Sequence, residues 1–188
     1  MKLTLVRHTS LQVLAGICYG QSDIDVAASF HDELSQLHPK LHGDVIDAIY
    51  ASPLQRCSKL ALTLGLGEVV HDERLKELHF GDWEMRAWDE IPRDIFDDWA
   101  QNYAHMSPPN GETFSQLQQR GVAFLDDIKQ AHAGEHVLAV THGGMIRALI
   151  AHVLNMPLKG LFRFNVDYAS VTRLDFAGDI PKIDFVNR

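Results

Sequence analysis

Short apolar runs that alternate with helix-patterned segments constrain the fold of this chain most strongly. Three runs rich in β-forming residues, at 3–6, 45–50 and 137–140, have the length and composition of buried strands. After the second and third runs, apolar residues recur at steps of three and four, which predicts helices that pack one face on a sheet. Strands alternating with helices predict an α/β fold: a three-layer αβα sandwich with a mostly parallel central sheet.

Capping signals mark where two of the helices should begin. Ser52 offers an N-cap, Pro53 suits the first helical position, and Gln55 stands where a capping box closes, so a helix is expected directly after the second strand. Thr113 and Gln116 form a second such signal and predict the start of a longer helix.

Two segments show a less regular pattern. Residues 79–103 carry all three tryptophans, which predicts a helical insertion around 79–106 over one end of the sheet. The tail, 161–185, contains strand-like pieces such as 170–174 and is expected to supply edge strands, one of them antiparallel. At 188 residues the chain has room for one compact domain, so we expect 1–188 to form a single domain.

Charge and cysteine content limit the partners of this chain. The formal net charge is −8, with 25 acidic residues against 17 Lys plus Arg, which argues against a nucleic-acid partner. No apolar run has membrane-spanning length, and the first eight residues leave no room for a signal peptide. Cys18 and Cys57 fit no disulfide framework or metal-ligand spacing. We therefore expect a cytoplasmic protein whose partner is a small anionic molecule.

Polar clusters follow directly after each of the three predicted strands. They are Arg7-His8-Thr9, residues 52–56 and Thr141-His142-Gly143-Gly144. Because ligands bind at the carboxyl ends of the strands in open α/β sheets, we expect these clusters to meet in one crevice.

The clusters contain the groups that phosphoryl transfer requires. A neutral imidazole at His8 can attack phosphorus, and the guanidinium groups of Arg7 and Arg56 match the phosphate oxygens. His142, if protonated, adds a third positive donor, and Gly143 lets the backbone approach the substrate. The sequence therefore predicts a phosphoryl-transfer site.

A carboxylic acid is also needed, and the segment 75–84 supplies candidates. Glu77 has apolar neighbours that could desolvate it, and Glu84 is the second choice. The alternative for Glu77 is a surface acid that pairs with Arg74 or Lys76. Residue patterns leave this choice open.

The motifs taken together resemble the histidine phosphatase superfamily, which has the phosphoglycerate mutase-like fold. They run in the family's order over about residues 3–144: Leu5-Val6-Arg7-His8, Ser52-Pro53-Leu54-Gln55-Arg56, Leu75-Lys76-Glu77, Phe80-Gly81-Asp82-Trp83-Glu84, Asn110-Gly111-Glu112-Thr113 and Thr141-His142-Gly143-Gly144. The resemblance implies His8 as nucleophile, Arg7, Arg56 and His142 as the phosphate pocket, and Glu77 as proton donor. It also implies that no metal or organic cofactor takes part.

Within the superfamily, residues 16–23 and Arg7-His8-Thr9 are similar to the α-ribazole-5′-phosphate phosphatases of cobalamin biosynthesis. The Ser22 hydroxyl of that Gly-flanked loop could meet the phosphate or leaving group, or the loop could be an ordinary turn. The chain departs from this subgroup at 24–27 and at 85–86, near the expected specificity surface. The resemblance thus implies phosphate chemistry and names one candidate substrate.

Other functions remain open at this level. Within enzymes they are a broad-specificity sugar-phosphate phosphatase, a phosphoglycerate mutase-like enzyme and a metallohydrolase that uses His8 and His142. Outside enzymes, the alternative is a catalytically inactive module that binds phosphate ligands. The three tryptophans could stack on an aromatic leaving group, although packing in a core is their commoner role.

Overall fold

A six-stranded mixed sheet forms the centre of the computed structural model, which describes residues 1–188. Its strands are β1 (Lys2–Arg7), β2 (Ala48–Ala51), β3 (Val69–His71), β4 (His136–Thr141), β5 (Val171–Asp175) and β6 (Lys182–Phe185), in the order β3-β2-β4-β1-β5-β6. The first four strands are parallel to one another, and β5 pairs antiparallel with both β1 and β6. This confirms the predicted mostly parallel sheet with antiparallel pairing towards one edge.

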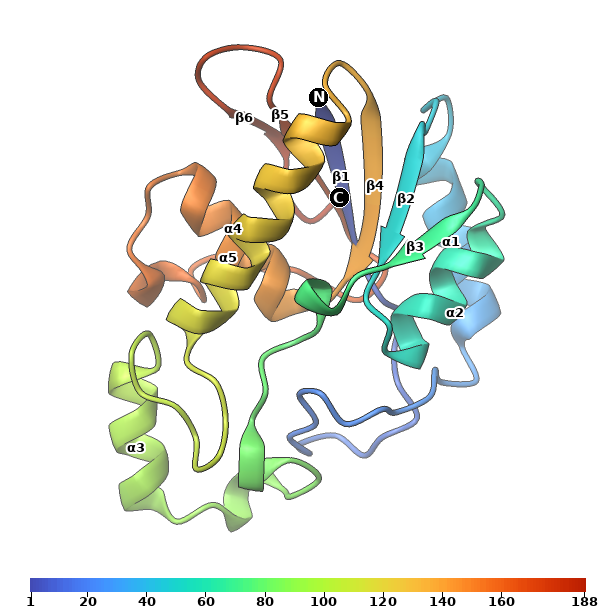
Figure 1. Ribbon diagram of the computed structural model, residues 1–188. Coiled ribbons are helices and arrows are strands. Elements are labelled where there is room, and N and C mark those ends of the chain that lie inside the picture. The colour runs from blue at the N-terminus through green and yellow to red at the C-terminus, as the bar shows by residue number, and fades with distance from the viewer.

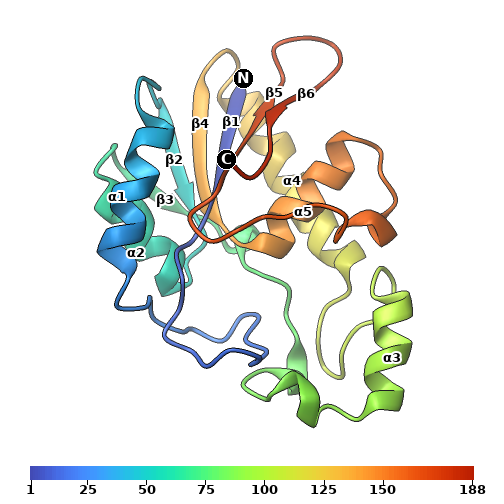
Figure 2. The ribbon, with the colours of Figure 1, turned by 180° about the vertical axis from the view of Figure 1, so that it is seen from behind.

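Helices cover both faces of the sheet (Figures 1 and 2). On one face lie α1 (Phe30–Leu41) and α2 (Gln55–Leu64), and on the other lie α4 (Phe114–Ala131) and α5 (Gly143–Val153). The remaining helices are α3 (Arg93–Asn102) and the short 3₁₀ helices η1 (Glu73–Leu75), η2 (Gly81–Trp83), η3 (Trp88–Glu90) and η4 (Leu158–Gly160). None of the helices combines the length and the apolar character needed to cross a membrane.

The alternation of side chains along the central strands produces two hydrophobic cores. In β1, Leu3 and Leu5 join the core that packs against α4 and α5, whereas Val6 joins the core under α1 and α2. In β4, Ala139 and Leu138 divide between the two cores in the same way. Because successive residues of a strand point to opposite faces, continuous apolar runs are what a sheet covered on both sides requires.

Two sequence predictions around β2 were wrong in detail. The strand starts at Ala48 and not at Val45, whose side chain is exposed. The helix after it starts at Gln55 with Leu54 as its N-cap, so Ser52 does not cap it. The Ser52 hydroxyl instead lies 2.8 Å from Nε2 of His142. A buried imidazole 90 residues away thus replaces the predicted local partner, because buried polar groups must be hydrogen-bonded wherever a partner exists.

The second capping box is present as predicted. The amide of Gln116 donates to Oγ1 of Thr113 at 3.1 Å, and the Gln116 side chain accepts from the Thr113 amide at 2.8 Å. This fixes the start of α4 at Phe114.

The tryptophans in 79–103 pack against one another beside α3. Trp83 and Trp99 are buried, with ring centroids 5.4 Å apart, and Phe80 packs edge-on against Trp88 at 5.3 Å. Their packing role is therefore visible in the structure.

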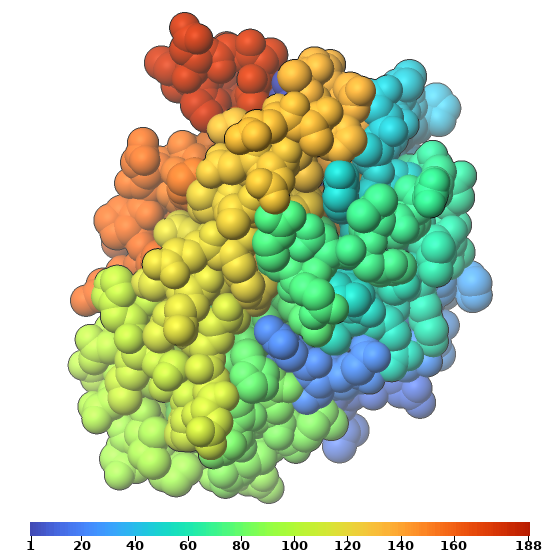
Figure 3. Space-filling view, viewed as in Figure 1, coloured from blue at the N-terminus to red at the C-terminus, as the bar shows by residue number.

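The segment that follows β3 lies between α4 and α2 on the face seen in the space-filling view, where it is green (Figure 3). Arg120 of α4 holds this segment by donating to the carbonyl oxygens of Arg74 and Lys76, both at 2.6 Å. Glu77 follows directly, so α4 fixes the backbone that carries this carboxyl group.

Candidate active site

The carboxyl ends of β1, β2 and β4 bring the predicted polar clusters together. His8 follows β1, Ser52 follows β2 and His142 follows β4, and all three are buried. The rings of His8 and His142 lie 5.1 Å apart between centroids and meet edge-on at 63°. Arg56, in the first turn of α2, is fully buried beside them. Parallel strands thus place distant segments in one site.

His8 is held as a neutral imidazole with one free nitrogen. Its Nδ1 lies 2.8 Å from the carbonyl oxygen of Thr9, and because a carbonyl only accepts, Nδ1 carries the proton. Burial, followed by the charges of Arg56 and Arg7, lowers the pKa of His8 well below its ordinary value of 6.5. The lone pair on Nε2 is therefore available for attack on an electrophile.

Arg56 connects the helix, the loop after residue 16 and the second histidine. Its Nη2 donates to the carbonyl oxygen of Gly20 at 2.6 Å and its Nη1 to that of Ser22 at 2.8 Å. Its Nε donates to Nδ1 of His142 at 3.3 Å. These bonds fix the plane of the guanidinium, and its position beside His8 suits an anion bound there.

The hydrogen bonds of His142 define its tautomer. Because Nδ1 accepts from Arg56, the proton is on Nε2, which donates to the Ser52 hydroxyl. Burial, and then the charge of Arg56, lowers the pKa of His142 well below its ordinary value of 6.5. The imidazole is neutral in the ligand-free protein. A positive charge on it requires a bound anion that offsets these effects.

Arg7 faces the site with part of its guanidinium unpaired. Its Nη1 donates to the carbonyl oxygen of Val166 at 2.6 Å, and the Tyr168 ring stacks on the group 3.9 Å from Cζ. Its Nε is buried without a hydrogen-bond partner. A Cβ on Gly143 would lie 3.3 Å from this Nε and 3.1 Å from Nη1 of Arg147, so the absence of a side chain at Gly143 lets both guanidinium groups approach the backbone closely.

The carboxyl group of Glu77 lies at the start of α5 and lines a small cavity together with Arg7. Its Oε2 accepts from the amide of Gly144 at 2.9 Å, and its Oε1 accepts from the amide of Leu78 at 2.8 Å. Arg7, Glu77, Gly143, Gly144 and Arg147 all line this cavity of about 130 Å³.

The alternative ion pairs of Glu77 are not formed. Arg74 pairs with Asp72 and Asp127, and Lys76 pairs with Glu73. The carboxyl group of Glu77 thus faces the cavity without a basic side-chain partner.

Glu84 supports the loop that contacts Arg56. Its Oε1 accepts from the amides of Gln21 and Phe80 at 2.9 and 3.0 Å. Its Oε2 accepts from the amide and the hydroxyl of Ser22 at 2.6 and 2.5 Å. The Ser22 hydroxyl is therefore directed at Glu84, and the hydrogen bonds of Glu84 hold Gln21 and Ser22 in place.

Sequence reasoning missed three side chains at the site. Tyr168 contacts both Arg7 and the His8 ring, and its hydroxyl lies 2.8 Å from that of Tyr19. Tyr19 lies within the loop 16–23 whose similarity to one subgroup the sequence showed, but no local pattern marks its side chain or that of Tyr168 as part of the site. Arg147 could have been found, because it stands four residues after Gly143 and so lies on the same face of a helix that starts there.

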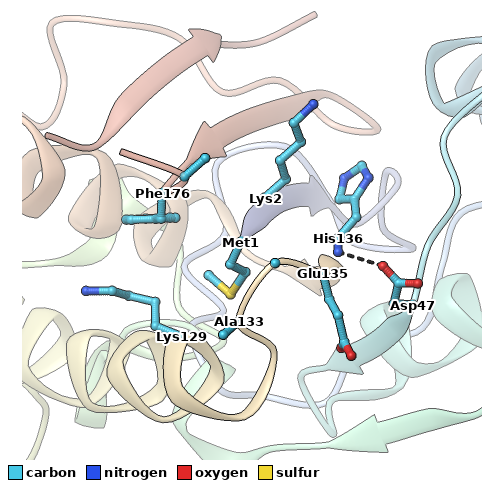
Figure 4. A pocket seen from close by; sticks show the side chains of 10 residues that line it. Met1, Lys2, Asp47, Lys129, Ala133, Glu135, His136 and Phe176 are labelled. Atoms are coloured by element: carbon cyan, nitrogen blue, oxygen red, sulfur yellow. Dashed lines mark hydrogen bonds between the residues drawn. The ribbon is translucent and has the colours of Figure 1, made fainter. Parts of the chain in front are cut away.

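A separate cavity of about 620 Å³ lies at the amino ends of β1 and β4 (Figure 4). It is lined by residues such as Lys2, Lys129 and His136, and the amide of His136 donates to Asp47 at 2.8 Å. None of the predicted site residues lines it. No group of three or more His, Cys, Asp or Glu side chains has an arrangement that could hold a metal ion.

Comparison with known proteins identifies the family. The model of the histidine phosphatase superfamily (branch 1) matches residues 3–188. The chain belongs to the histidine phosphatase superfamily. As a member with phosphatase-named relatives, it is a phosphoric monoester hydrolase.

Relatives of this histidine phosphatase carry different substrate names. The adenosylcobalamin/alpha-ribazole phosphatase of Escherichia coli is 29% identical, over 93% of this chain and 90% of that protein. Phosphoserine phosphatase 1 of Hydrogenobacter thermophilus is 28% identical, over 90% of this chain and 84% of that protein. A phosphoserine phosphatase of Entamoeba histolytica, solved with phosphoserine, superposes with a TM-score of 0.88 at 25% identity, over 99% and 96% of the two chains.

Proposed function

We propose that this histidine phosphatase hydrolyses a small phosphate monoester through a phosphohistidine formed on Nε2 of His8. One observation carries the proposal: His8 is a buried neutral imidazole whose proton is held on Nδ1, so that Nε2 keeps its lone pair. Arg7 and Arg56 lie close enough to act on its charge, which is the environment a transferred phosphoryl group requires.

In the first step, the Nε2 lone pair forms a bond to phosphorus and the ester P–O bond breaks. Arg7, Arg56, His142 and the amide of Gly143 stabilise the charge on the non-bridging oxygens. The departing oxygen takes a proton from Glu77, whose carboxyl group is oriented by two backbone amides. The products are phosphohistidine, the free alcohol and the Glu77 carboxylate.

In the second step, Glu77 works in the opposite direction. Its carboxylate takes a proton from water as the water oxygen attacks phosphorus. The P–N bond breaks, its electron pair returns to Nε2 of His8, and inorganic phosphate leaves. Both residues end in their starting protonation states.

One candidate substrate is α-ribazole 5′-phosphate. Two observations support it: the similarity of residues 16–23 to that subgroup and the name of the Escherichia coli relative. This substrate would place the enzyme in cobalamin biosynthesis. A cytoplasmic location stays a prediction from the sequence.

The second candidate is a small phosphate ester with a carboxylate, such as O-phosphoserine. The phosphoserine phosphatases among the relatives support it. The structural observation in its favour is the unpaired guanidinium of Arg147 beside Glu77.

Rapidly quenched turnover tests the covalent mechanism. Mass spectrometry at neutral or alkaline pH should detect one acid-labile phosphoryl group on His8 in the wild type. His8→Ala should lose the adduct and nearly all turnover, whereas His31→Ala, a change on the exposed face of α1, should retain both. Full activity of His8→Ala would end the proposal.

A panel of phosphate esters assayed with a chelator separates the remaining alternatives. The proposed mechanism predicts unchanged activity with chelator and inhibition by vanadate, which resembles the five-coordinate transition state. Loss of activity with chelator would favour the metallohydrolase alternative.

A further inference from the structure

Arg147, in α5, has no role in the proposed phosphoryl-transfer steps. Its side chain forms no ion pair within the protein, and its buried Nε has no hydrogen-bond partner. Burial, and then the charge of Arg7, lowers the pKa of its guanidinium, and the opposing charges of Glu77 and Asp167 do not offset this. A half-buried cation next to a second cation is costly unless an anion binds to both.

Arg147 lies on the side of the site where the leaving group departs. It lines the 130 Å³ cavity together with Arg7 and Glu77, whereas His8 and His142 do not line that cavity. In an in-line displacement the nucleophile and the leaving group lie on opposite sides of phosphorus. The cavity that contains the proton donor is therefore the leaving-group side.

The cavity walls strengthen any ion pair formed there. Phe80, Phe114 and Phe162 line it, and the Phe162 ring lies 5.4 Å from Cζ of Arg147. The buried ring of Phe114 and the partly buried ring of Phe80 give the cavity apolar walls, and charge–charge attraction is stronger beside such walls than at an open surface.

Charge balance indicates what the cavity accepts. The phosphoryl group of the substrate neutralises Arg7 and Arg56. Glu77 and Asp167 lie near enough to act on the charge of Arg147, but neither carboxylate forms an ion pair with it, and Glu77 is uncharged when it serves as proton donor. A planar guanidinium binds a carboxylate through two parallel hydrogen bonds, which a hydroxyl group cannot match.

We propose that Arg147 binds a carboxylate on the leaving group, so that the preferred substrates are phosphate esters of small hydroxy acids. The inference rests on the proposed function, because Glu77 as proton donor defines the leaving-group side. It favours the second candidate substrate class over α-ribazole 5′-phosphate, which has no such carboxylate.

A matched pair of substrates tests this role. 3-Phosphoglycerate and glycerol 3-phosphate differ in one group, a carboxylate in the first and a hydroxymethyl group in the second. The wild type should prefer 3-phosphoglycerate in kcat/KM. Arg147→Met should lower kcat/KM for 3-phosphoglycerate by about 10- to 100-fold, mainly through KM, and leave glycerol 3-phosphate within about threefold. Arg147→Lys should restore part of the preference.

Two controls distinguish a loss of carboxylate binding from a general loss of activity or of folding. Arg163→Met removes an exposed arginine and should change neither substrate. Denaturant unfolding of each variant shows whether it is folded. Equal losses on both substrates in a folded Arg147→Met protein, or a wild type that prefers glycerol 3-phosphate or α-ribazole 5′-phosphate, would overturn the inference while leaving the phosphohistidine mechanism intact. A wild type that forms no phosphohistidine would instead overturn the proposed function.

Discussion

Arg56 donates a hydrogen bond from Nε to Nδ1 of His142 across a distance of 3.3 Å, in a fully buried environment. Because a guanidinium group has only donors, it keeps Nδ1 of His142 as an acceptor, and its positive charge disfavours the imidazolium. The same charge acts on His8. Two neutral imidazoles therefore lie beside two cations, an arrangement suited to a phosphate dianion.

This arrangement predicts a pH-dependent stability. The pKa values of His8 and His142 are lowered in the folded protein, so below their ordinary value of 6.5 the unfolded chain binds protons that the folded one does not. The two neutral imidazoles therefore contribute to the stability of the folded protein above pH 6.5, and this contribution is lost as the pH falls. The free energy of unfolding should decrease by about 1.4 kcal/mol per pH unit for each imidazole.

Urea unfolding between about pH 5 and pH 7.5 measures this slope. His8→Gln and His142→Gln should each make it less steep. The pKa of the half-buried His136 is also lowered, but this residue is unchanged in both variants, so its contribution cancels in the comparison. Identical slopes in the wild type and both variants would show that the site imidazoles are not held neutral.

Glu77→Gln should impair substrates according to their leaving group. An alkyl phosphate needs a proton on the departing oxygen, so its kcat should fall by about 10²- to 10⁴-fold. 4-Nitrophenyl phosphate has a leaving group that departs without a proton, so its turnover should fall much less.

Glu84→Gln is the matched control for this change. Glu84 accepts four hydrogen bonds from Gln21, Ser22 and Phe80, so its loss should loosen the loop and affect both substrates alike. If Glu77→Gln also affected both substrates equally, the proton donor would have to be Glu84 or water.

Arg120→Lys should weaken the support of Glu77. The Arg120 guanidinium donates to three carbonyl oxygens, including that of Glu77 at 2.8 Å, and pairs with Glu112. A lysine ammonium cannot reach all these acceptors. We expect about a tenfold loss of kcat on alkyl phosphates with little change for 4-nitrophenyl phosphate, since only the former depend on Glu77.

Arg74→Lys is the corresponding control. Arg74 also lies at the contact between α4 and the segment after β3, but it pairs with Asp72 and Asp127 and not with Glu77. It should leave the ratio of the two activities unchanged. An Arg120→Lys protein with equal losses on both substrates and a lower Tm would mean that Arg120 supports the fold alone.

Local patterns predicted the sheet and the position of the reactive groups. Alternating strands and helices follow from apolar periodicity, which each segment carries by itself. The rule that parallel strands present their carboxyl ends together predicted that Arg7, His8, Arg56 and His142 lie close to one another, as they do in the structure. The proposed roles of these residues extend that prediction and await the experiments above.

The tertiary structure decided which partner each polar side chain uses. Glu77 and Glu84 lie in one short segment, yet only the contacts show that Glu84 accepts its hydrogen bonds from Gln21, Ser22 and Phe80 and that Glu77 lines the cavity. Ser52 has the pattern of a helix cap but accepts from His142, and Arg147 has no ion-pair partner and no hydrogen-bond partner for its buried Nε. The sequence determines which groups can form hydrogen bonds and ion pairs, whereas burial and distance, set by segments far apart in the chain, determine which of them form.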